Sequence, residues 1–386
     1  MIVKKIAYVS NLDGNLYGFR LAWMKALQAK GFEVCAIAPE GEYGKLLRAA
    51  GIKTLSYPMK RGGLNPFVEA GTVVRLFRIF RREKFHLVHS FTAKPNVYCS
   101  IAGAFCSVPV VNHVTGLGYF FTESGAKARL LRAMIEGFYK ISFRCAKRVV
   151  FQNPEDMKEL ETLVEDSKKV LIPGTGVDSD FFSPSAVDLS TSAQVRGSLQ
   201  LAANSTVVTV IGRLLWHKGI REFVEAAKIL MEKRPNVEFL VVGWHDTGNP
   251  SAVTLEFLEE AKRLPRLHFA GKRDNIREIL AVTDIYVLPS YREGMPRTVL
   301  EAMAMCKPVV TTDVPGCRQA VVDGVTGLVV PPRDSAGLAQ AIEKLLQSQE
   351  LCHAMGQAGR NRAVAQFSNQ VVIKELLRMY SELKLC

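Results

Sequence analysis

The sequence predicts an α/β protein with two doubly wound parallel sheets, one in each half of the chain. The length of 386 residues exceeds one ordinary core, because domains typically hold about 100–200 residues. Short β-branched runs alternate with segments of helical periodicity in both halves, which is typical of right-handed βαβ units. Hydrophobic residues make up 48% and charged residues 23%, a composition that favours two sizeable cores and excludes disorder.

The first half predicts five strands in one open sheet. They are expected at residues 4–9, 32–38, 86–90, 109–113 and 148–151. Helical periodicity at 18–30 and 66–84 predicts helices that cross between the strands.

The second half repeats this alternation and predicts a second sheet. Its strands are expected at residues 206–211, 237–242, 267–270, 284–289, 308–311 and 328–330.

Residues 173–205 are rich in Gly, Ser, Thr and Asp, which places a linker near 183–192. We therefore expect domains at 1–186 and 187–366, with a C-terminal helix at 367–386 that packs back toward the first domain. Ligands of such sheets bind beyond the carboxyl ends of the strands, so we expect function in those loops, facing a cleft between the domains.

The positive charge is concentrated in the first half. The formal net charge is +13, and residues 1–186 hold 26 Lys and Arg against 16 Asp and Glu. An anionic partner is therefore expected there: a membrane surface, a phosphorylated acceptor or a nucleic acid. No nucleic-acid motif is present and aromatic residues do not interleave with the basic clusters, so we expect no nucleic-acid binding.

The cysteines and the hydropathy pattern limit the compartment. Eight cysteines show no C-x-x-C pair or metal-ligand spacing, which favours buried thiols in a reducing compartment. No run approaches the roughly 18 apolar residues of a spanning helix, so a soluble or peripheral protein is expected.

The strongest local signal is the segment 289–301, Pro-Ser-Tyr-Arg-Glu-Gly-Met-Pro-Arg-Thr-Val-Leu-Glu. A strand ends at its start, a Gly/Pro loop follows, and a helix is expected near Pro296, since proline suits the first helical turn. Free amides at a helix start bind phosphate. Glu293 lies in the loop and Glu301 inside the helix, so the two carboxylates are placed to contact different parts of one ligand; the alternative is two unrelated solvated acids.

A second loop carries two cations. The segment 212–219, Gly-Arg-Leu-Leu-Trp-His-Lys-Gly, follows the first strand of the second half. The planar guanidinium of Arg213 and the ammonium of Lys218 together suit a diphosphate, although a solvated pair is the ordinary alternative.

The two loops in this order resemble the family 4 retaining glycosyltransferases, which have the GT-B fold. Glu293 through Glu301 is similar to the family's E-x7-E motif, and Arg213 with Lys218 to its diphosphate pair. The segment 171–178 resembles the interdomain signature, and 316–332 resembles the C-terminal donor-domain block. The resemblance covers nearly the whole chain.

The resemblance implies a hexosyltransferase that needs no cofactor and no metal. It implies that Glu293, Arg213 and Lys218 carry the reaction: Glu293 lies by the donor sugar, and the cations neutralise the departing diphosphate. Whether Glu293 acts as a covalent nucleophile or supports front-face attack stays open; we favour the latter. The other implied donor contacts are Glu301 at the ribose, Gly294, Met295, Pro296 and Thr298 at the sugar and phosphates, Lys272 and Arg273 at uracil, and Gly14 in a flexible first loop at 10–18.

The segments 89–95, 111–118 and 242–250 resemble a narrower branch that extends undecaprenyl-diphosphate-linked sugars, such as N-acetylgalactosaminyltransferases acting on lipid-linked diacetylbacillosamine. The branch implies UDP-GalNAc or UDP-GlcNAc as donor, a polyprenyl-diphosphate-linked acceptor, a role in bacterial glycan assembly or protein glycosylation, and a place on the cytoplasmic face of the inner membrane. Candidates for the acceptor or sugar are His113, Thr115, Gly116, Lys94 and Asn15. Many family members have a histidine where Thr115 aligns, so a histidine base is in doubt, and His113 is alternatively a hydrogen-bonded core residue.

Basic residues flank apolar ones between 127 and 148, a pattern that fits an amphipathic helix on an anionic membrane or, alternatively, a core stripe with solvated charges. The basic residues are Lys127, Arg129, Arg132, Lys140, Arg144, Lys147 and Arg148, and a second cluster holds Arg75, Arg78, Arg81, Arg82 and Lys84.

Three other hypotheses were considered. Asp178-Ser-Asp180 spells a metal-binding D-x-D motif, but among Gly and Ser at the interdomain link we expect no metal there. A glycosyltransferase with a soluble acceptor would use the basic face only for a phosphorylated small molecule. A UDP-sugar epimerase on the same architecture would need no acceptor.

Overall fold

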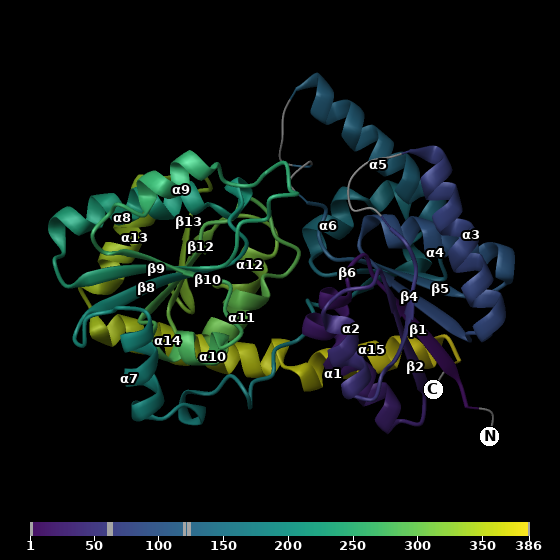
Figure 1. Cartoon of the computed structure of the whole chain (residues 1–386), viewed down its shortest axis with the longest axis horizontal. Coiled ribbons are helices and arrows are strands. Elements are labelled where there is room, and N and C mark those ends of the chain that lie inside the picture. Colours follow the sequence, from purple (N-terminus) through teal and green to yellow (C-terminus); the bar gives the residue numbers. More distant parts are fainter. Residues whose placement is uncertain (1–2, 60–64, 119–120, 122–124, 385–386) are drawn as a thin grey trace. The chain divides into compact units, whose positions relative to one another are not determined.

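The protein is described by a computed structural model that covers residues 3–59, 65–118, 121 and 125–384. The chain forms two compact units. The first comprises Met1–Thr175 with Val372–Cys386, and the second comprises Gly176–Val371. Each unit holds one parallel sheet with helices on both faces (Figure 1).

The first unit contains a seven-stranded sheet with the order β3-β2-β1-β4-β5-β6-β7, and every pairing is parallel. Parallel strands need crossover helices, which cover the sheet and make its central strands fully buried. The strands are β1 (Lys5–Val9), β2 (Glu33–Ala38), β3 (Lys53–Ser56), β4 (Leu87–Phe91), β5 (Val110–Val114), β6 (Arg148–Phe151) and β7 (Lys169–Leu171).

Two helical layers complete the first unit. Leu16, Trp23 and Leu27 of α1 (Asp13–Ala29) pack on one face, where α2 (Tyr43–Ala49) also lies. On the other face, Leu76 and Phe80 of α3 (Pro66–Glu83) pack with α4 (Ala93–Cys106), and α5 (Ala126–Cys145) lies beside α4. The sheet edge beyond β6 carries α6 (Pro154–Glu159) and the turns Glu161–Leu163 and Asp166–Lys168.

The end of the chain returns to the first unit, as the sequence predicts. Helix α15 (Asn369–Glu382) places Val372, Leu376 and Tyr380 in the core beneath α1. The Tyr380 hydroxyl lies 3.1 Å from that of Tyr8 on β1. The last helix is therefore part of the first core.

The division of the chain falls after Thr175 and not after residue 186. Val177 donates its amide to Phe367, and Phe182 packs in the second unit's core. The polar composition of 183–192 suggested a linker, but this stretch forms the turn Pro184–Ala186 and the start of α7 (Leu189–Ser198), capped by Asp188. Local composition did not reveal that the hydrophobic residues on either side of this stretch, Phe182 and Val195, are buried in that unit.

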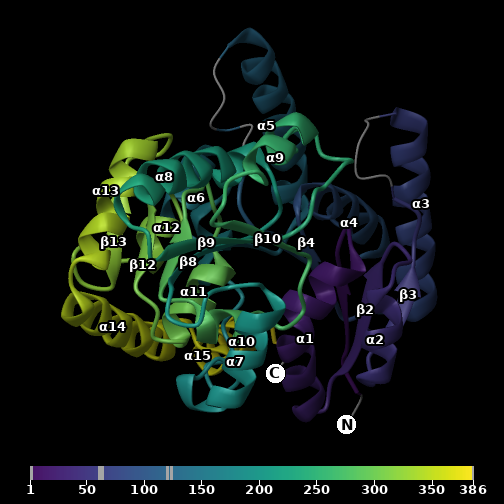
Figure 2. The same ribbon diagram turned by 60° about the vertical axis from the view of Figure 1, so that its left-hand side comes forward.

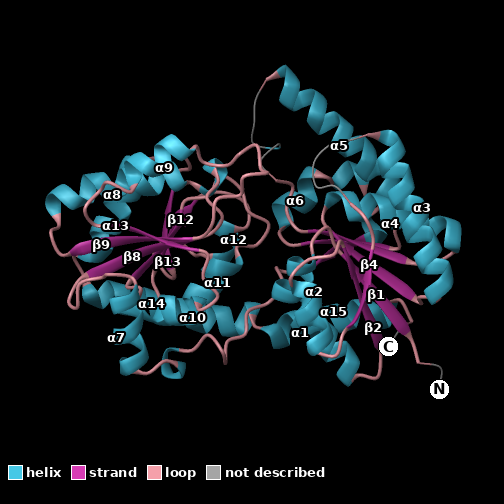
Figure 3. Ribbon diagram, in the orientation of Figure 1, coloured by secondary structure: helices cyan, strands magenta, loops and turns pink. Residues whose placement is uncertain are grey.

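The second unit contains a six-stranded parallel sheet with the order β10-β9-β8-β11-β12-β13. The order reverses between β8 and β11, which is where doubly wound sheets bind ligands. Figure 3 shows these strands at the centre of the unit. They are β8 (Thr206–Ile211), β9 (Val237–Val242), β10 (Leu267–Gly271), β11 (Ile285–Leu288), β12 (Val309–Thr312) and β13 (Gly327–Val330).

Helices cover both faces of this sheet. Figure 2 shows α8 (Ile220–Lys233) and α9 (Leu255–Ala261) on one side, and α10 (Ile276–Val282) and α11 (Arg297–Ala304) on the other. Two hydrophobic clusters, one on each face, form the core. The remaining elements are the turn Trp216–Lys218, α12 (Cys317–Ala320), α13 (Ser335–Leu346) and α14 (Gln349–Phe367).

The two predicted sheets are confirmed, and all eleven predicted strands are present within one or two residues of their expected bounds. Two further strands, β3 and β7, were missed. Both lie at sheet edges and are only partly buried, so neither has the continuous apolar run of a central strand. The helix expected at 18–30 begins at Asp13, which shortens the first loop.

Candidate functional site

Three loops at the carboxyl edge of the second sheet, those after β8, β11 and β12, pack against one another. Gly219, at the end of the β8 loop, has φ +74°, and a Cβ atom there would overlap the carbonyl oxygen of Pro289 after β11. Gly316, after β12, has φ +79°, and a Cβ there would lie 2.6 Å from the carbonyl oxygen of Gly294. Only glycine leaves room for such close backbone contacts, so these two positions allow the loops to pack together.

The ammonium of Lys218 forms an ion pair with a carboxylate oxygen of Glu293. The hydroxyl of Ser290 donates to the same Oε1 atom at 2.7 Å. Ser290 is fully buried, and its carbonyl oxygen accepts a hydrogen bond from Thr312 on β12. The carboxylate of the β11 loop and one cation of the β8 loop are thus brought together.

The second cation of the β8 loop lies beside another carboxylate. Arg213 donates Nη1–H to Oδ2 of Asp246 at 3.0 Å. Asp246 belongs to the loop 243–254 that follows β9. The sequence singled out the segment 242–250 as branch-like but gave no role to Asp246.

The loop 289–296 leads into α11, which begins at Arg297, one residue after the expected start, with Pro296 at the N-cap. The Pro296 carbonyl oxygen accepts a hydrogen bond from the Val299 amide at 3.1 Å, at the first turn of the helix. Met295 packs against the core of the unit, and the Thr298 hydroxyl is hydrogen-bonded to the buried Tyr286. The predicted donor residues of this segment therefore lie at the carboxyl edge of the sheet.

Glu301 is buried inside α11 and accepts a hydrogen bond from Nε of Arg297, one turn earlier, at 2.7 Å. Burial raises the pKa of the Glu301 carboxyl, and the Arg297 guanidinium only partly offsets that rise. Removing a carboxylate from water is unfavourable, so a functional reason for an acid here is expected.

Sequence reasoning missed a group of side chains that supports the β11 loop. The Tyr291 hydroxyl donates to Glu222 of α8 at 2.7 Å, and the guanidinium of Arg333 lies 4.7 Å from the Tyr291 ring centre. Burial and then the Glu222 carboxylate raise the pKa of Tyr291, which keeps its proton. The Tyr291 amide donates to the His217 carbonyl at 2.9 Å, which ties the β11 loop to the β8 loop.

His217, beside Lys218, places Nδ1 2.8 Å from the Ser251 hydroxyl. Burial lowers the pKa of His217 to about 4, with a smaller contribution from Lys218. The imidazole is therefore neutral at physiological pH and serves as a hydrogen-bonding link between loops.

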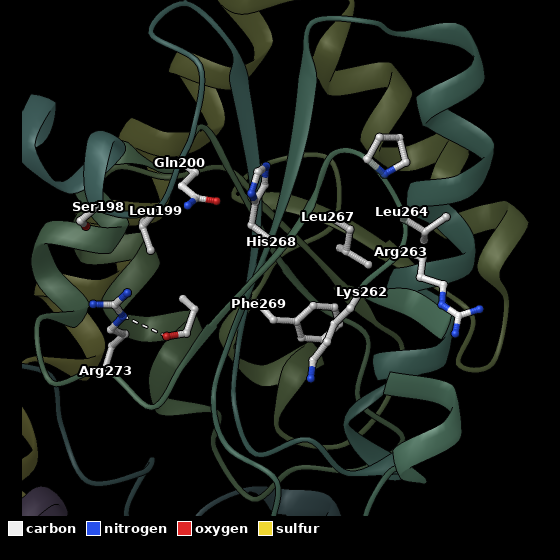
Figure 4. A pocket seen from close by; sticks show the side chains of 12 residues that line it. Ser198, Leu199, Gln200, Lys262, Arg263, Leu264, Leu267, His268, Phe269 and Arg273 are labelled. Carbon is white, nitrogen blue, oxygen red and sulfur yellow. Dashed lines mark hydrogen bonds between the residues drawn. The ribbon is translucent and has the colours of Figure 1, made fainter. Parts of the chain in front are cut away.

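The turn after β10 carries Lys272 and Arg273, the predicted uracil contacts. Arg273 turns back and donates Nε–H to the Ala270 carbonyl at 3.0 Å. Its side chain lines an open cavity of about 600 Å³ along the outer edge of β10, which Figure 4 shows with Gln200, His268 and Phe269.

In the first unit, the segment 10–18 is not the flexible loop that was expected. Gly14 and Asn15 lie in the first turn of α1. The Asp13 carboxylate accepts the amides of Gly14 and Gly44 at 2.8 and 2.9 Å, and Asn15 donates its side-chain amide to Asn11 at 3.0 Å. These contacts start the helix five residues before its periodic apolar pattern begins.

His113 lies in the interior of the first unit. Its Nδ1 is 3.3 Å from Nε2 of His89, and its Nε2 is 3.2 Å from the Gln152 amide. His89 in turn lies 2.6 Å from the Tyr380 hydroxyl. Burial lowers the pKa of both histidines well below its usual range. His113 is thus a hydrogen-bonded core residue in this structure, the alternative that the sequence left open.

The other acceptor candidates are only partly buried. Thr115 and Gly116 follow β5 at the carboxyl edge of the first sheet, where Gly116 has φ +124°. Lys94, near the start of α4, donates to Glu69 of α3 at 2.8 Å, and Tyr98 donates to the same carboxylate.

Helix α5 exposes an apolar stripe. Leu130, Met134, Phe138 and Ile141 are 67%, 42%, 43% and 50% exposed, whereas Tyr139 and Phe143 on the opposite side are buried. Arg129, Lys140 and Arg144 are exposed beside the stripe, and the side chain of Lys127 lies outside the described residues. The core-stripe alternative therefore does not account for these four side chains. Within the described ranges, no helix is long and apolar enough to cross a membrane.

Asp178 of the rejected D-x-D sequence has a local structural role. Its carboxylate accepts the Phe181 amide at 2.9 Å, and its carbonyl accepts the Phe182 amide at 2.8 Å. It shapes the turn that follows the first crossing between the units.

Comparison with known proteins extends over both units. Residues 192–362 match the family described as glycosyl transferases group 1, and residues 20–175 match the glycosyl transferase 4-like domain. The chain is 32% identical, over 97% of its length and 98% of the relative's, to the N,N'-diacetylbacillosaminyl-diphospho-undecaprenol alpha-1,3-N-acetylgalactosaminyltransferase of Campylobacter jejuni.

Two further proteins are similar. The UDP-Gal:alpha-D-GlcNAc-diphosphoundecaprenol alpha-1,3-galactosyltransferase of Escherichia coli is 27% identical over 81% of this chain and 79% of that protein. The crystal structure of Anabaena HepE in complex with UDP and glucose has a TM-score of 0.82 at 19% identity, covering 98% of this chain and 100% of that one. This structural likeness shows that the chain has the predicted GT-B fold.

Proposed function

Because this chain belongs to the group 1 glycosyltransferases, we propose that it moves an N-acetylhexosamine, such as GalNAc, from a UDP-sugar to an undecaprenyl-diphosphate-linked saccharide with retention of anomeric configuration. The observation that carries this proposal is the meeting of Lys218 and Glu293 at the carboxyl edge of the second sheet. Membership of the family excludes the alternative of a UDP-sugar epimerase, because group 1 enzymes transfer glycosyl groups.

The roles of the reacting residues follow from where charge develops. Breaking the bond between the anomeric carbon and the diphosphate leaves negative charge on the diphosphate and positive charge on the sugar. Arg213 and Lys218 stabilise the former, and Glu293 stabilises the latter. The departing diphosphate accepts the proton of the acceptor hydroxyl, which attacks the anomeric carbon on the same face of the sugar. Because Arg213 and Lys218 neutralise the diphosphate, this proposed step uses no metal.

Further residues are proposed to contact the donor. Glu301 holds the ribose hydroxyls, for which its buried carboxylate is suited. Gly294, Met295, Pro296 and Thr298 line the sugar and phosphates at the start of α11. Lys272 and Arg273 contact uracil after Arg273 leaves the Ala270 carbonyl, and Gly14 allows the diphosphate to approach the start of α1.

Two relatives support a lipid-linked acceptor. Both the Campylobacter jejuni and the Escherichia coli enzymes are named for undecaprenol-diphosphate-linked saccharides. Thr115, Gly116, Lys94 and Asn15 are the proposed acceptor contacts, whereas His113, which hydrogen-bonds His89 and Gln152 in the core, is not among them. The exposed stripe of α5 with its basic neighbours holds the enzyme at an anionic membrane, on its cytoplasmic face, where a lipid-linked acceptor is reached.

The test is a transfer assay with a panel of UDP- and GDP-sugars and a short polyprenyl-diphosphate-linked saccharide, with the product linkage read by NMR. We expect transfer from UDP-GalNAc or UDP-GlcNAc with an α-linkage. Glu293→Gln and Lys218→Ala should each reduce transfer by at least about 100-fold while circular dichroism stays unchanged. Extension of water-soluble glycosides with no reaction of the lipid-linked acceptor would support the soluble-acceptor alternative instead.

A further inference from the structure

The loop after β9 is fastened along the loop after β8. The Leu214 amide donates to the Trp244 carbonyl at 3.0 Å, the Trp216 amide donates to the Ser251 carbonyl at 2.8 Å, and the Val253 amide donates to the Leu214 carbonyl at 3.1 Å. The residues 243–254 therefore form a bracing loop beside the segment that carries Arg213 and Lys218.

The glycine at the start of the bracing loop makes this contact close. Gly243 has φ +155°, and a Cβ atom there would overlap the carbonyl oxygen of Gly212. The Gly212 amide donates to the Val242 carbonyl at 2.9 Å, so the two loops leave their strands side by side. The position of the bracing loop relative to Arg213 is thus set by backbone contacts on both sides.

Asp246 is the residue of the bracing loop that reaches Arg213, with 3.0 Å between Oδ2 and Nη1. Its backbone is held by a turn in which its carbonyl accepts the Asn249 amide at 2.9 Å. The Asp246 side chain is 11% exposed and that of Arg213 is 35% exposed. The Asp246 side chain is therefore more buried than that of Arg213, which is partly open to solvent.

A carboxylate at this place has two opposite effects on an anionic ligand. It fixes a long, rotatable side chain, which lowers the ordering cost of binding, and it repels the anion. Because the Asp246 carboxylate lies 3.0 Å from the Arg213 guanidinium, the positive charge of the guanidinium partly offsets this repulsion. A guanidinium also has five N–H donors in a planar fork, so one donated to Asp246 leaves others for phosphate oxygens.

We propose that Asp246 is a positioning residue for donor recognition, which holds the Arg213 guanidinium in the orientation that receives the diphosphate of the nucleotide sugar. This inference rests on the proposed function, in which Arg213 contacts that diphosphate. Asp246 itself touches no substrate.

The test measures the dissociation constants of UDP and UMP for the full chain by calorimetry. Asp246→Asn keeps the shape and removes the charge. We expect it to reduce the preference for UDP over UMP by about tenfold, whereas a general loss of structure would weaken both nucleotides alike. The matched control is Glu343→Gln, which removes the carboxylate from the Arg234–Glu343 pair at another place in the same unit and should leave both constants unchanged.

A double-mutant cycle with Arg213→Ala tests the positioning role of Asp246 separately from the diphosphate contact of Arg213. In the Arg213→Ala background, Asp246→Asn should have no further effect, because the side chain that it orients is gone. An undiminished effect there overturns the positioning role. Tighter UDP binding by Asp246→Asn alone also overturns it, since repulsion would then be the main effect of the carboxylate. If Arg213→Ala leaves UDP binding unchanged, the assignment of Arg213 in the proposed function is wrong.

Discussion

Lys218 and Glu293 form an ion pair although 75 positions separate them in the chain. The pair joins the loop after β8 to the loop after β11, the neighbouring strands at which the sheet order reverses. An anionic ligand that binds the Lys218 ammonium competes with the Glu293 carboxylate for it. Under the proposed function, binding of a nucleotide diphosphate and release of the Glu293 carboxylate are therefore linked.

This linkage predicts opposite effects of the two residues on product binding. Lys218→Ala should weaken UDP binding by about 10-fold or more, because a charge-assisted contact to phosphate is lost. Glu293→Gln should bind UDP as tightly as the wild type or more tightly, since it frees the ammonium and removes a negative charge. Isothermal titration with UDP measures both. Weaker UDP binding by Glu293→Gln would contradict the proposed competition for Lys218.

The glycine at position 219 is expected to be irreplaceable for a steric reason. Its φ is +74°, and a Cβ would overlap the Pro289 carbonyl oxygen. Gly219→Ala should destabilise the second unit by about 1–3 kcal/mol and lower transfer strongly, because the two loops must separate. Gly197→Ala is the control: a Cβ there meets nothing within 4 Å, and its helical position favours alanine. Thermal unfolding and the transfer rate check both; equal behaviour of the two variants would contradict the steric argument.

The ionised Glu301 carboxylate is expected to reduce the stability of the folded protein and to strengthen binding of the UDP-sugar. Its pKa is raised by burial, so the folded state loses stability as the pH rises through that pKa and the carboxyl ionises. At pH 7.5, Glu301→Gln should therefore be at least as stable as the wild type in urea. Its KM for the UDP-sugar should rise by roughly tenfold, because the amide is a weaker acceptor for ribose hydroxyls. A clear loss of stability with an unchanged KM would assign Glu301 a purely structural role.

The sequence allowed the two sheets and the main loops of the site to be predicted, and the reasons are local. A fully buried strand such as β11 is a continuous apolar run, and the glycine and proline around Glu293 mark a loop between a strand and a helix. The edge strands β3 and β7 lack that run. The start of α1 at Asp13 depends on contacts to Gly44, a residue 31 positions away, and no local pattern encodes such a contact.

The partners of the site residues were the less predictable part. Asp246 meets Arg213 because β8 and β9 are neighbours and their loops lie side by side. Tyr291, in the loop after β11, meets Glu222 of α8, the helix that follows the neighbouring strand β8. The hydrogen-bond partners of His113, His89 on β4 and Gln152 after β6, come from the strands on either side of β5. Pairing across elements is decided by topology, which periodicity does not specify.

His217 predicts an acid-sensitive contribution to stability. Its pKa is about 4 in the folded protein against an ordinary value near 6.5. The imidazole is neutral in both states above pH 6.5, so its contribution is complete there. Between about pH 6.5 and 4 the unfolded chain binds a proton that the folded chain rejects, and this contribution is lost.

His217→Asn removes the titrating group and keeps a hydrogen-bonding side chain near Ser251. In urea denaturation at a series of pH values, the variant should lose less stability than the wild type over this interval. Buried His89 and His113 titrate in both proteins, so the difference between the two curves reports His217 alone. Parallel curves would show that His217 is not the titrating group.

The exposed stripe of α5 predicts binding to anionic membranes. Leu130 and Phe138 are 67% and 43% exposed, and fully burying such a side chain in an apolar environment contributes about 1.5–3 kcal/mol. Leu130→Ser with Phe138→Ser should therefore weaken binding to vesicles containing anionic lipid by at least about tenfold. High salt should weaken it further, because the neighbouring arginines and lysines act through charge. Leu189→Ser removes a 90% exposed leucine from the other unit and is the matched control. Sedimentation with vesicles measures the partition; equal losses in both variants, or none in either, would mean that α5 is not the membrane-binding surface.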